Sequence, residues 1–237
     1  MKLKRYLTAI RRYHRSKGHG IHSPFAFSFV LNVLRERHPY YAYEEIAEWR
    51  KIAIDNAKGF WHHPKIISYK SAKLIFRVTN YFNPKAIMQI GTSYGVSSAC
   101  ALKVSSSSEL YLCEASIEQY PVTRLLLSRF ENKISQYRSF GEGLNDYREA
   151  CEEGNDPFIL INDIKAEEYS EVLTYLYEVR NGKGVIIIRN LLRNPALNAL
   201  WEAIRNAAPT GMTFSNGKTA IIVATPKLPH QNFSLWF

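Results

Sequence analysis

The segment AIMQIGTSYGVS, residues 86–97, decides the fold class of this chain. A short apolar run leads into two glycines, Gly91 and Gly95, and then into a helix-compatible segment, residues 96–104. A strand, a tight glycine turn and a helix N-terminus bring backbone N–H groups and a positive dipole end close to a ligand. A second apolar run follows after about twenty residues and ends in Glu114, the spacing at which an acid accepts ribose hydroxyls. Together they predict a site for a nucleoside-containing cofactor.

Strand and helix patterns alternate from residue 85 onward. The runs Ile159–Ile161 and Val185–Ile188 are continuously apolar, which is typical of strands buried on both faces. Asn216-Gly217 then predicts a type I′ hairpin turn between two further strands. The predicted fold is a three-layer, doubly wound α/β domain with a mainly parallel seven-stranded sheet and a C-terminal antiparallel hairpin. We expect strands at 86–90, 109–113, 134–139, 157–162 and 184–188, and helices near 95–104, 117–131, 142–151, 167–180 and 195–206.

Residues 1–84 have helical patterns, with Ser23-Pro24 as a cap and first turn, and form a predicted helical arm before the cofactor domain, residues 85–237. The arm is basic: residues 1–35 hold eight Lys and Arg and no acid, in a chain of net charge +10. Clustered basic residues beside tyrosines are typical of protein segments that bind RNA or acidic membranes. The alternative is a solvated helix that packs its Tyr and Ile face on the domain.

Composition indicates the size of the domain and the class of protein. The 237 residues are 46% hydrophobic, enough for one packed domain, and no apolar run reaches the ~20 residues of a membrane span. The start of the chain does not resemble a signal peptide. The three cysteines have neither metal-type nor redox spacing. These features predict a reduced, cytoplasmic protein, and they say nothing of its oligomeric state.

The chain resembles the class I S-adenosylmethionine-dependent methyltransferases. QIGTSYGVS, residues 89–97, is similar to the E-I-G-T-S/G-x-G-x-S turn of the small-molecule O-methyltransferase branch. HGIHSPF, residues 19–25, resembles a segment that heads uncharacterised bacterial members of the class.

The resemblance implies an S-adenosylmethionine cofactor, a small-molecule acceptor and a role for each matching residue. Glu114 would hold the ribose, and Asn162 would lie beside the sulfonium and the substrate. Asp163, or Lys165 nearby, would accept a proton. The residues around the methionine part would be Gly91, Thr92, Ser93 and Gly95, and those along the adenine would be Gly141 and Glu142.

Three positions depart from the family pattern. Gln89 replaces the first-motif acid, Asn162 precedes the expected fourth-strand acid, and Arg189-Asn190 replaces the Asp-Asn of the metal-dependent members. A guanidinium cannot serve where a hard cation needs an anionic oxygen. We therefore expect no metal site, and we expect Arg189 to pair with Asp163 or with an anionic acceptor. The same departures leave open a catalytically silent scaffold that acts as an RNA or protein interaction module.

Two other enzyme classes fit part of the pattern. Gly91–Gly95 matches the G-x-S-x-G elbow of α/β-hydrolases, and Ser93, Asp163 and His230 would give a triad in the right chain order. That fold needs several strands before the elbow, where this chain has helical patterns. A dinucleotide oxidoreductase shares the strand, turn and acid but would need a third glycine.

Four histidines invite a metal interpretation: His19, His22, His62 and His63. No cysteine or acid cluster completes a ligand set around them, so loop histidines bonded to backbone are favoured. A further hypothesis is that His22 covers the active site.

Overall fold

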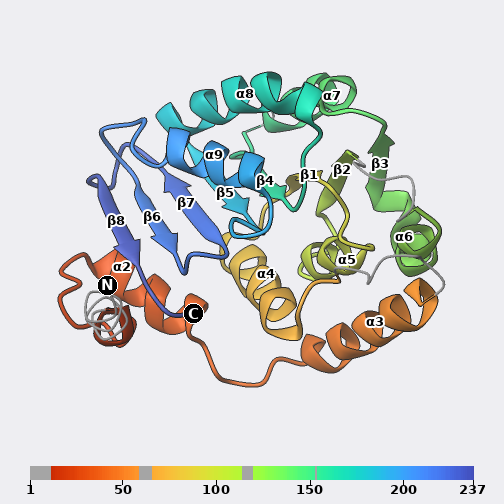
Figure 1. Ribbon diagram of the computed structural model, residues 1–237, viewed down its shortest axis with the longest axis horizontal. Helices are drawn as coiled ribbons and strands as arrows, with labels where there is room; N and C mark the ends of the chain where they lie inside the picture. The colour runs from red at the N-terminus through yellow and green to blue at the C-terminus, as the bar shows by residue number, and fades with distance from the viewer. Residues whose placement is uncertain (1–11, 59–65, 114–119, 153) are drawn as a thin grey trace.

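The computed structural model describes residues 12–58, 66–113, 120–152 and 154–237. Its centre is an eight-stranded sheet with the order β3-β2-β1-β4-β5-β7-β6-β8 (Figure 1). Strands β1 to β5 pair in parallel, and β7 runs antiparallel to both β5 and β6. The strands are Ala86–Ile90 (β1), Glu109–Cys113 (β2), Ile134–Tyr137 (β3), Phe158–Ile161 (β4), Gly184–Ile188 (β5), Met212–Ser215 (β6), Ala220–Ala224 (β7) and Gln231–Ser234 (β8).

The predicted doubly wound, mainly parallel sheet with a terminal hairpin is confirmed, but the predicted strand number was wrong. The chain continues past the β6–β7 hairpin into β8, which pairs in parallel with β6 from Met212 opposite Gln231 to Ser215 opposite Ser234. The eighth strand therefore covers the hydrogen-bonding edge of β6 that would otherwise face solvent.

Two helical layers cover the faces of the sheet. Helices α7, α8 and α9 lie on one face, and α3, α4, α5 and α6 lie on the other (Figure 1). Alternate strand residues point to opposite faces, so Ile87 joins the core under α4 and α5 while Met88 joins the core under α7 and α8. The helices are Pro24–Phe29 (α2), Ala42–Ala57 (α3), Tyr69–Phe82 (α4), Val96–Leu102 (α5), Tyr120–Leu127 (α6), Phe140–Glu152 (α7), Tyr169–Asn181 (α8) and Pro195–Ile204 (α9).

The N-terminal helices belong to the same packing. Ser23 Oγ accepts a hydrogen bond from Ala26 N and caps α2, as the Ser23-Pro24 pattern predicts. A π-helical segment, η1 (Val30–Leu34), follows α2, and helix α4 packs beside it. Helices α3 and α4 share a hydrophobic core with β1, β4 and β5. The boundary between an arm and a cofactor domain at residue 84 stays a prediction.

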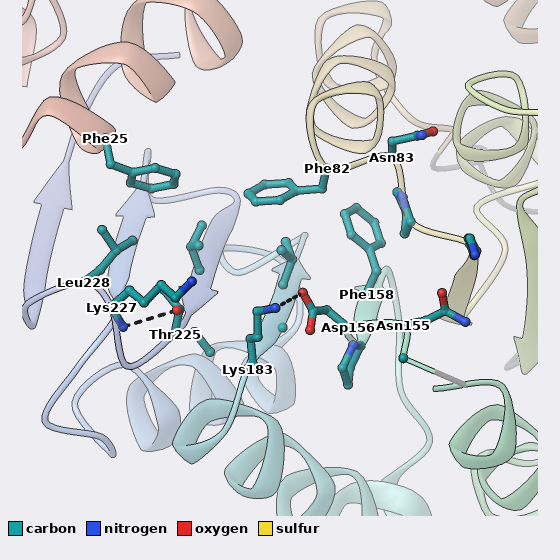
Figure 2. A pocket seen from close by; sticks show the side chains of 18 residues that line it. Phe25, Phe82, Asn83, Asn155, Asp156, Phe158, Lys183, Thr225, Lys227 and Leu228 are labelled. Atoms are coloured by element: carbon teal, nitrogen blue, oxygen red, sulfur yellow. Dashed lines mark hydrogen bonds and ion pairs between the residues drawn. The ribbon is translucent and has the colours of Figure 1, made fainter. Parts of the chain in front are cut away.

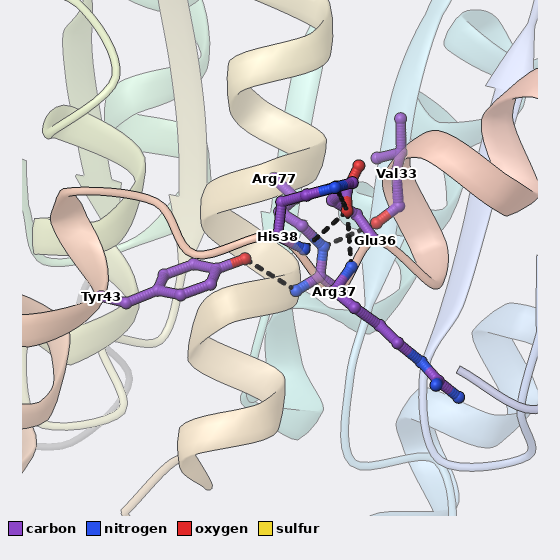
Figure 3. A network of polar contacts seen from close by, with 6 residues as sticks. All are labelled: Val33, Glu36, Arg37, His38, Tyr43 and Arg77. Carbon is purple, nitrogen blue, oxygen red and sulfur yellow. Dashed lines mark hydrogen bonds and ion pairs between the residues drawn. The ribbon is translucent and has the colours of Figure 1, made fainter.

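A buried arginine closes the end of η1 (Figure 3). Arg77 of α4 donates to Val33 O at 2.6 Å, to Leu34 O at 3.1 Å and to Tyr43 Oη at 3.2 Å. Each of its nitrogens therefore has an acceptor, and its charge lies at the negative end of a helical segment. Arg77 ties α4, η1 and α3 together.

Within the described residues, every helix is too short or too polar to cross a membrane.

Candidate functional site

The turn after β1 lies at the carboxyl edge of the sheet, the edge where β1, β2, β4 and β5 end. Gly91 and Gly95 have positive φ angles of 74° and 78°, and so do the intervening Ser93 (51°) and Tyr94 (60°). Gly91 N donates to Cys113 O at 2.9 Å, which ties the turn to the end of β2. A non-glycine residue in this conformation costs about 1–2 kcal/mol, so surrounding contacts must hold the turn in place.

Two buried side-chain amides donate hydrogen bonds to the turn. Gln89 Nε2 donates to Gly91 O at 2.9 Å, and Asn162 Nδ2 donates to the same oxygen at 2.7 Å. Both amides also donate to Ser97 Oγ, at 3.1 and 3.0 Å, and that hydroxyl donates to Thr92 O at 2.9 Å. Only the nitrogen of each amide can face a carbonyl oxygen, so the contacts fix both orientations. Gln89 therefore has a structural role where the family pattern has an acid.

Arg189 completes this network from the end of β5. Its Nη1 donates to Asn162 Oδ1, whereas its Nε is buried and has no hydrogen-bond partner in the described part of the chain. The side chain is 5% exposed, and burial lowers the pKa of Arg189 to about 10, so the guanidinium is charged at neutral pH. Arg189 is a buried cation bonded to a neutral amide.

Asp163 follows Asn162 and lies exposed at the same edge. Its Oδ1 accepts from Asn194 Nδ2 at 2.8 Å and from Ile164 N at 3.0 Å. Of the two partners expected for Arg189, Asp163 was wrong and an anionic acceptor is not tested. Arg189 donates to Asn162, and Asp163 accepts from Asn194, the cap of α9.

Lys165 has its partners elsewhere. Its Nζ donates to Arg138 O at 2.8 Å and lies 4.0 Å from Glu168 Oε1. These contacts hold the loop after β4 against the loop after β3.

The remaining predicted cofactor residues divide into three groups. Thr92 is buried and its Oγ1 accepts from Thr123 Oγ1 at 3.1 Å. Gly141 and Glu142 lie in the first turn of α7, which begins two residues earlier than expected, and Glu142 Oε2 accepts from Arg138 N at 2.9 Å. Glu114 lies outside the described residues.

The triad of Ser93, Asp163 and His230 expected for the serine hydrolase alternative was wrong. His230 precedes β8 at the amino edge, the edge where β4 and β5 begin, and lies near Arg180 and Asn232. Ser93 and Asp163 lie at the carboxyl edge, so the three groups cannot form a triad.

The HGIHSPF segment also lies at the amino edge. Ser23 Oγ is 3.9 Å from the sulfur of Met212, the first residue of β6, and both His19 and His22 are exposed. This position contradicts the hypothesis that His22 covers a site at the carboxyl edge. His62 and His63 lie outside the described residues.

A cavity of about 450 Å³, not predicted from the sequence, opens at the amino edge (Figure 2). Phe25, Phe82 and Phe158 line its apolar part, and Lys183 pairs with Asp156 at 2.7 Å on its rim. It is larger than the other cavities described below. Its residues come from five separate segments, so no local sequence pattern could have revealed it.

No protein-family model and no curated protein matches this sequence. Solved structures do match. Cofactor-bound Rv0187 from MTB superposes with a TM-score of 0.55 at 13% identity, over 85% of this chain and 96% of that one. The O-methyltransferase from Bacillus cereus in complex with SAH gives 0.51 at 17% identity, over 78% and 92%. The SAH-bound methyltransferase PaMTH1 of Podospora anserina gives 0.52 at 14% identity, over 86% and 97%.

The fold is the methyltransferase fold. In open α/β sheets ligands bind outside the carboxyl ends of the strands, where the strand order reverses. Here the order reverses between β1 and β4, where the Gly91 turn meets Asn162 and Asp163. By this rule the expected ligand site lies at the ends of β1 and β4, whereas the larger cavity lies at the opposite edge of the sheet.

Proposed function

We propose that this protein binds S-adenosylmethionine at the carboxyl edge between β1 and β4 and transfers its methyl group to an oxygen or nitrogen of a small acceptor, without a metal ion. The observation that carries the proposal is the Gly91 turn, held by Gln89 and Asn162 at the point where the strand order reverses. Its support is the fold shared with proteins crystallised with SAH.

The Gly91 turn lies against the end of β4 so closely that it requires glycine. A Cβ built on Gly91 would lie 3.0 Å from Asp163 N, so the turn and the end of β4 approach backbone to backbone. We assign the methionine part to Gly91, Thr92, Ser93 and Gly95, the ribose to Glu114, and the adenine to Gly141 and Glu142. Asn162 would lie nearest the sulfonium.

S-adenosylmethionine would supply an activated methyl group, so the protein's own task is to align the acceptor and accept a proton. Within the described residues, Asn194 and Ile164 both donate to Oδ1 of Asp163, which leaves Oδ2 to accept a proton. Lys165 is held by Arg138 O, and we therefore assign proton acceptance to Asp163.

Metal independence follows from the same side chains. A divalent cation in this fold position would need anionic oxygens at the ends of β4 and β5. Asn162 Oδ1 instead accepts from Arg189, whose positive charge would repel a cation placed there.

Calorimetric titration with S-adenosylmethionine and SAH tests the proposal. Glu114→Gln should weaken binding by about 1.5–3 kcal/mol, because it removes the charge that accepts the ribose hydroxyls. Glu109→Gln, at the opposite end of β2, is the matched control and should bind as the wild type does. If the wild type does not bind the cofactor at millimolar concentration, the methyltransferase proposal fails and the catalytically silent scaffold takes its place.

The basic arm carries the second candidate function, RNA binding. Residues 1–11 lie outside the described residues, and Arg12 Nε donates to Ser234 Oγ at 2.7 Å. Deleting residues 1–11 therefore spares the contacts of Arg12 while removing Lys2, Lys4, Arg5 and Arg11. RNA affinity that falls with salt and is lost on truncation would support this function. Equal affinity of both forms would assign the arm to packing.

A further inference from the structure

A second cavity, of about 220 Å³, opens at the carboxyl edge, where Arg189 and Asn190 follow β5. It lies between the start of α4, the loop after β5 and the loop before β7. A neighbouring cavity of about 370 Å³ shares part of this lining and adds Arg12, Lys70 and Arg77. No Asp or Glu side chain of the described residues lines either cavity. The polar lining of the smaller cavity is Ser68, Ser71, Arg189, Asn190, Arg193, Lys218 and Thr219.

Arg189 is the buried charge of this cavity. It is 5% exposed, and its Nε has no partner among the described residues. Its pKa is lowered by burial and to a smaller extent by Arg193, with Cys100 opposing in part, and no described carboxylate is among the groups that shift it. A buried cation without a counter-ion is unfavourable unless a charge of opposite sign joins it.

The first turn of α4 adds to the positive field. Ser68 caps this 14-residue helix and accepts from Ser71 N at 3.2 Å, and the first turn contains no acid. The backbone N–H groups of such a turn and the positive end of the helix dipole favour an anion. The exposed Lys218, on the hairpin between β6 and β7, lines the same cavity.

We propose that this cavity binds an anionic group, carboxylate or phosphate, of the methyl acceptor, held by Arg189 and Lys218 at the start of α4. The acceptor role rests on the proposed function. Because Arg189 also donates to Asn162, the bound anion would lie next to the Gly91 turn. A sulfonium and a guanidinium carry the same sign, and an anionic acceptor would offset both charges.

Titration with inorganic phosphate, and separately with benzoate, tests the inference at constant ionic strength with chloride as the replaced anion. We expect saturable binding of at least one of the two anions, and the anion that binds more tightly identifies the group as phosphate or carboxylate. Lys218→Gln should weaken it at least about fivefold and Arg189→Met at least about tenfold, as for hydrogen bonds to charged groups. Lys227→Gln, an exposed lysine at the amino-edge cavity, is the matched control and should bind as the wild type does.

Titration of SAH into the same proteins separates the two proposals. Absence of saturable binding of both anions, or equal binding by wild type and Lys218→Gln, would overturn this inference even if SAH binds. Because Lys218 is exposed, that variant will fold even if Arg189→Met does not. Anion binding in a protein that does not bind SAH would overturn the acceptor role along with the proposed function.

Discussion

Replacing Arg189 with methionine should leave the protein as stable as the wild type or make it more stable, although Arg189 is buried. Arginine in water titrates above about 12, and burial lowers the pKa of Arg189 to about 10. Since one pKa unit is about 1.4 kcal/mol, the buried charge costs about 3 kcal/mol. Loss of the donor to Asn162 Oδ1 costs about 1–3 kcal/mol in return. The expected net change is a gain of about 0–2 kcal/mol, measured by urea unfolding at pH 7.

The gain should depend on pH in one direction. A base with a lowered pKa in the folded state leaves the unfolded chain binding more protons above about pH 10. The wild type is therefore stabilised as pH rises through 10, because the cost of the buried charge disappears. The difference between Arg189→Met and wild type should shrink over the same interval.

Arg77→Met is the matched control for this substitution. Arg77 is also buried, but each of its three nitrogens has an acceptor. Removing it leaves the carbonyls of Val33 and Leu34 without their donor, which should cost about 2–4 kcal/mol. A loss of more than about 2 kcal/mol for Arg189→Met would refute the account of Arg189 as an uncompensated charge.

Two further predictions concern the turn and the chemistry. Gly91→Ala should lower the free energy of unfolding by about 1–3 kcal/mol more than Gly154→Ala does in urea. Both glycines have positive φ, but of the two only Gly91 would place a Cβ 3.0 Å from backbone atoms. Equal losses would show that crowding by Asp163 is unimportant. Methyl transfer should continue in excess chelator, because Arg189 donates to Asn162 Oδ1, the oxygen that a cation would need. Activity that is lost in chelator and restored by Mg²⁺ would contradict this prediction.

The sequence predicted the central sheet well because buried strands leave a strong pattern. Expected and observed bounds agree for β1, β2 and β5, all of which come from short apolar runs. Strand β8 was missed because QNFS has little of the residue preference of a strand, and its pairing with β6 cannot be seen locally. The early start of α7 was missed because glycines disfavour helices. A Cβ on Gly143 would lie 2.7 Å from the Tyr137 ring, so close packing requires glycine there.

The turn of the candidate site could also be predicted, but its support could not. Gln89 and Asn162 lie 73 positions apart and meet at Gly91 O only because β1 and β4 are neighbours in the sheet. The separate partners of Arg189 and Asp163 depend likewise on where Asn194 caps α9. Such contacts are set by topology and have no counterpart in local spacing.

A crystal structure of the protein soaked with SAH tests the central claim most directly, because the proposed cofactor site and the larger amino-edge cavity lie at opposite ends of the strands. We predict SAH density beside Gly91 and Asp163, with its ribose toward the end of β2. Density in the cavity lined by Phe25 and Phe158, or no density beside Gly91 at saturating SAH, would contradict the proposed cofactor site.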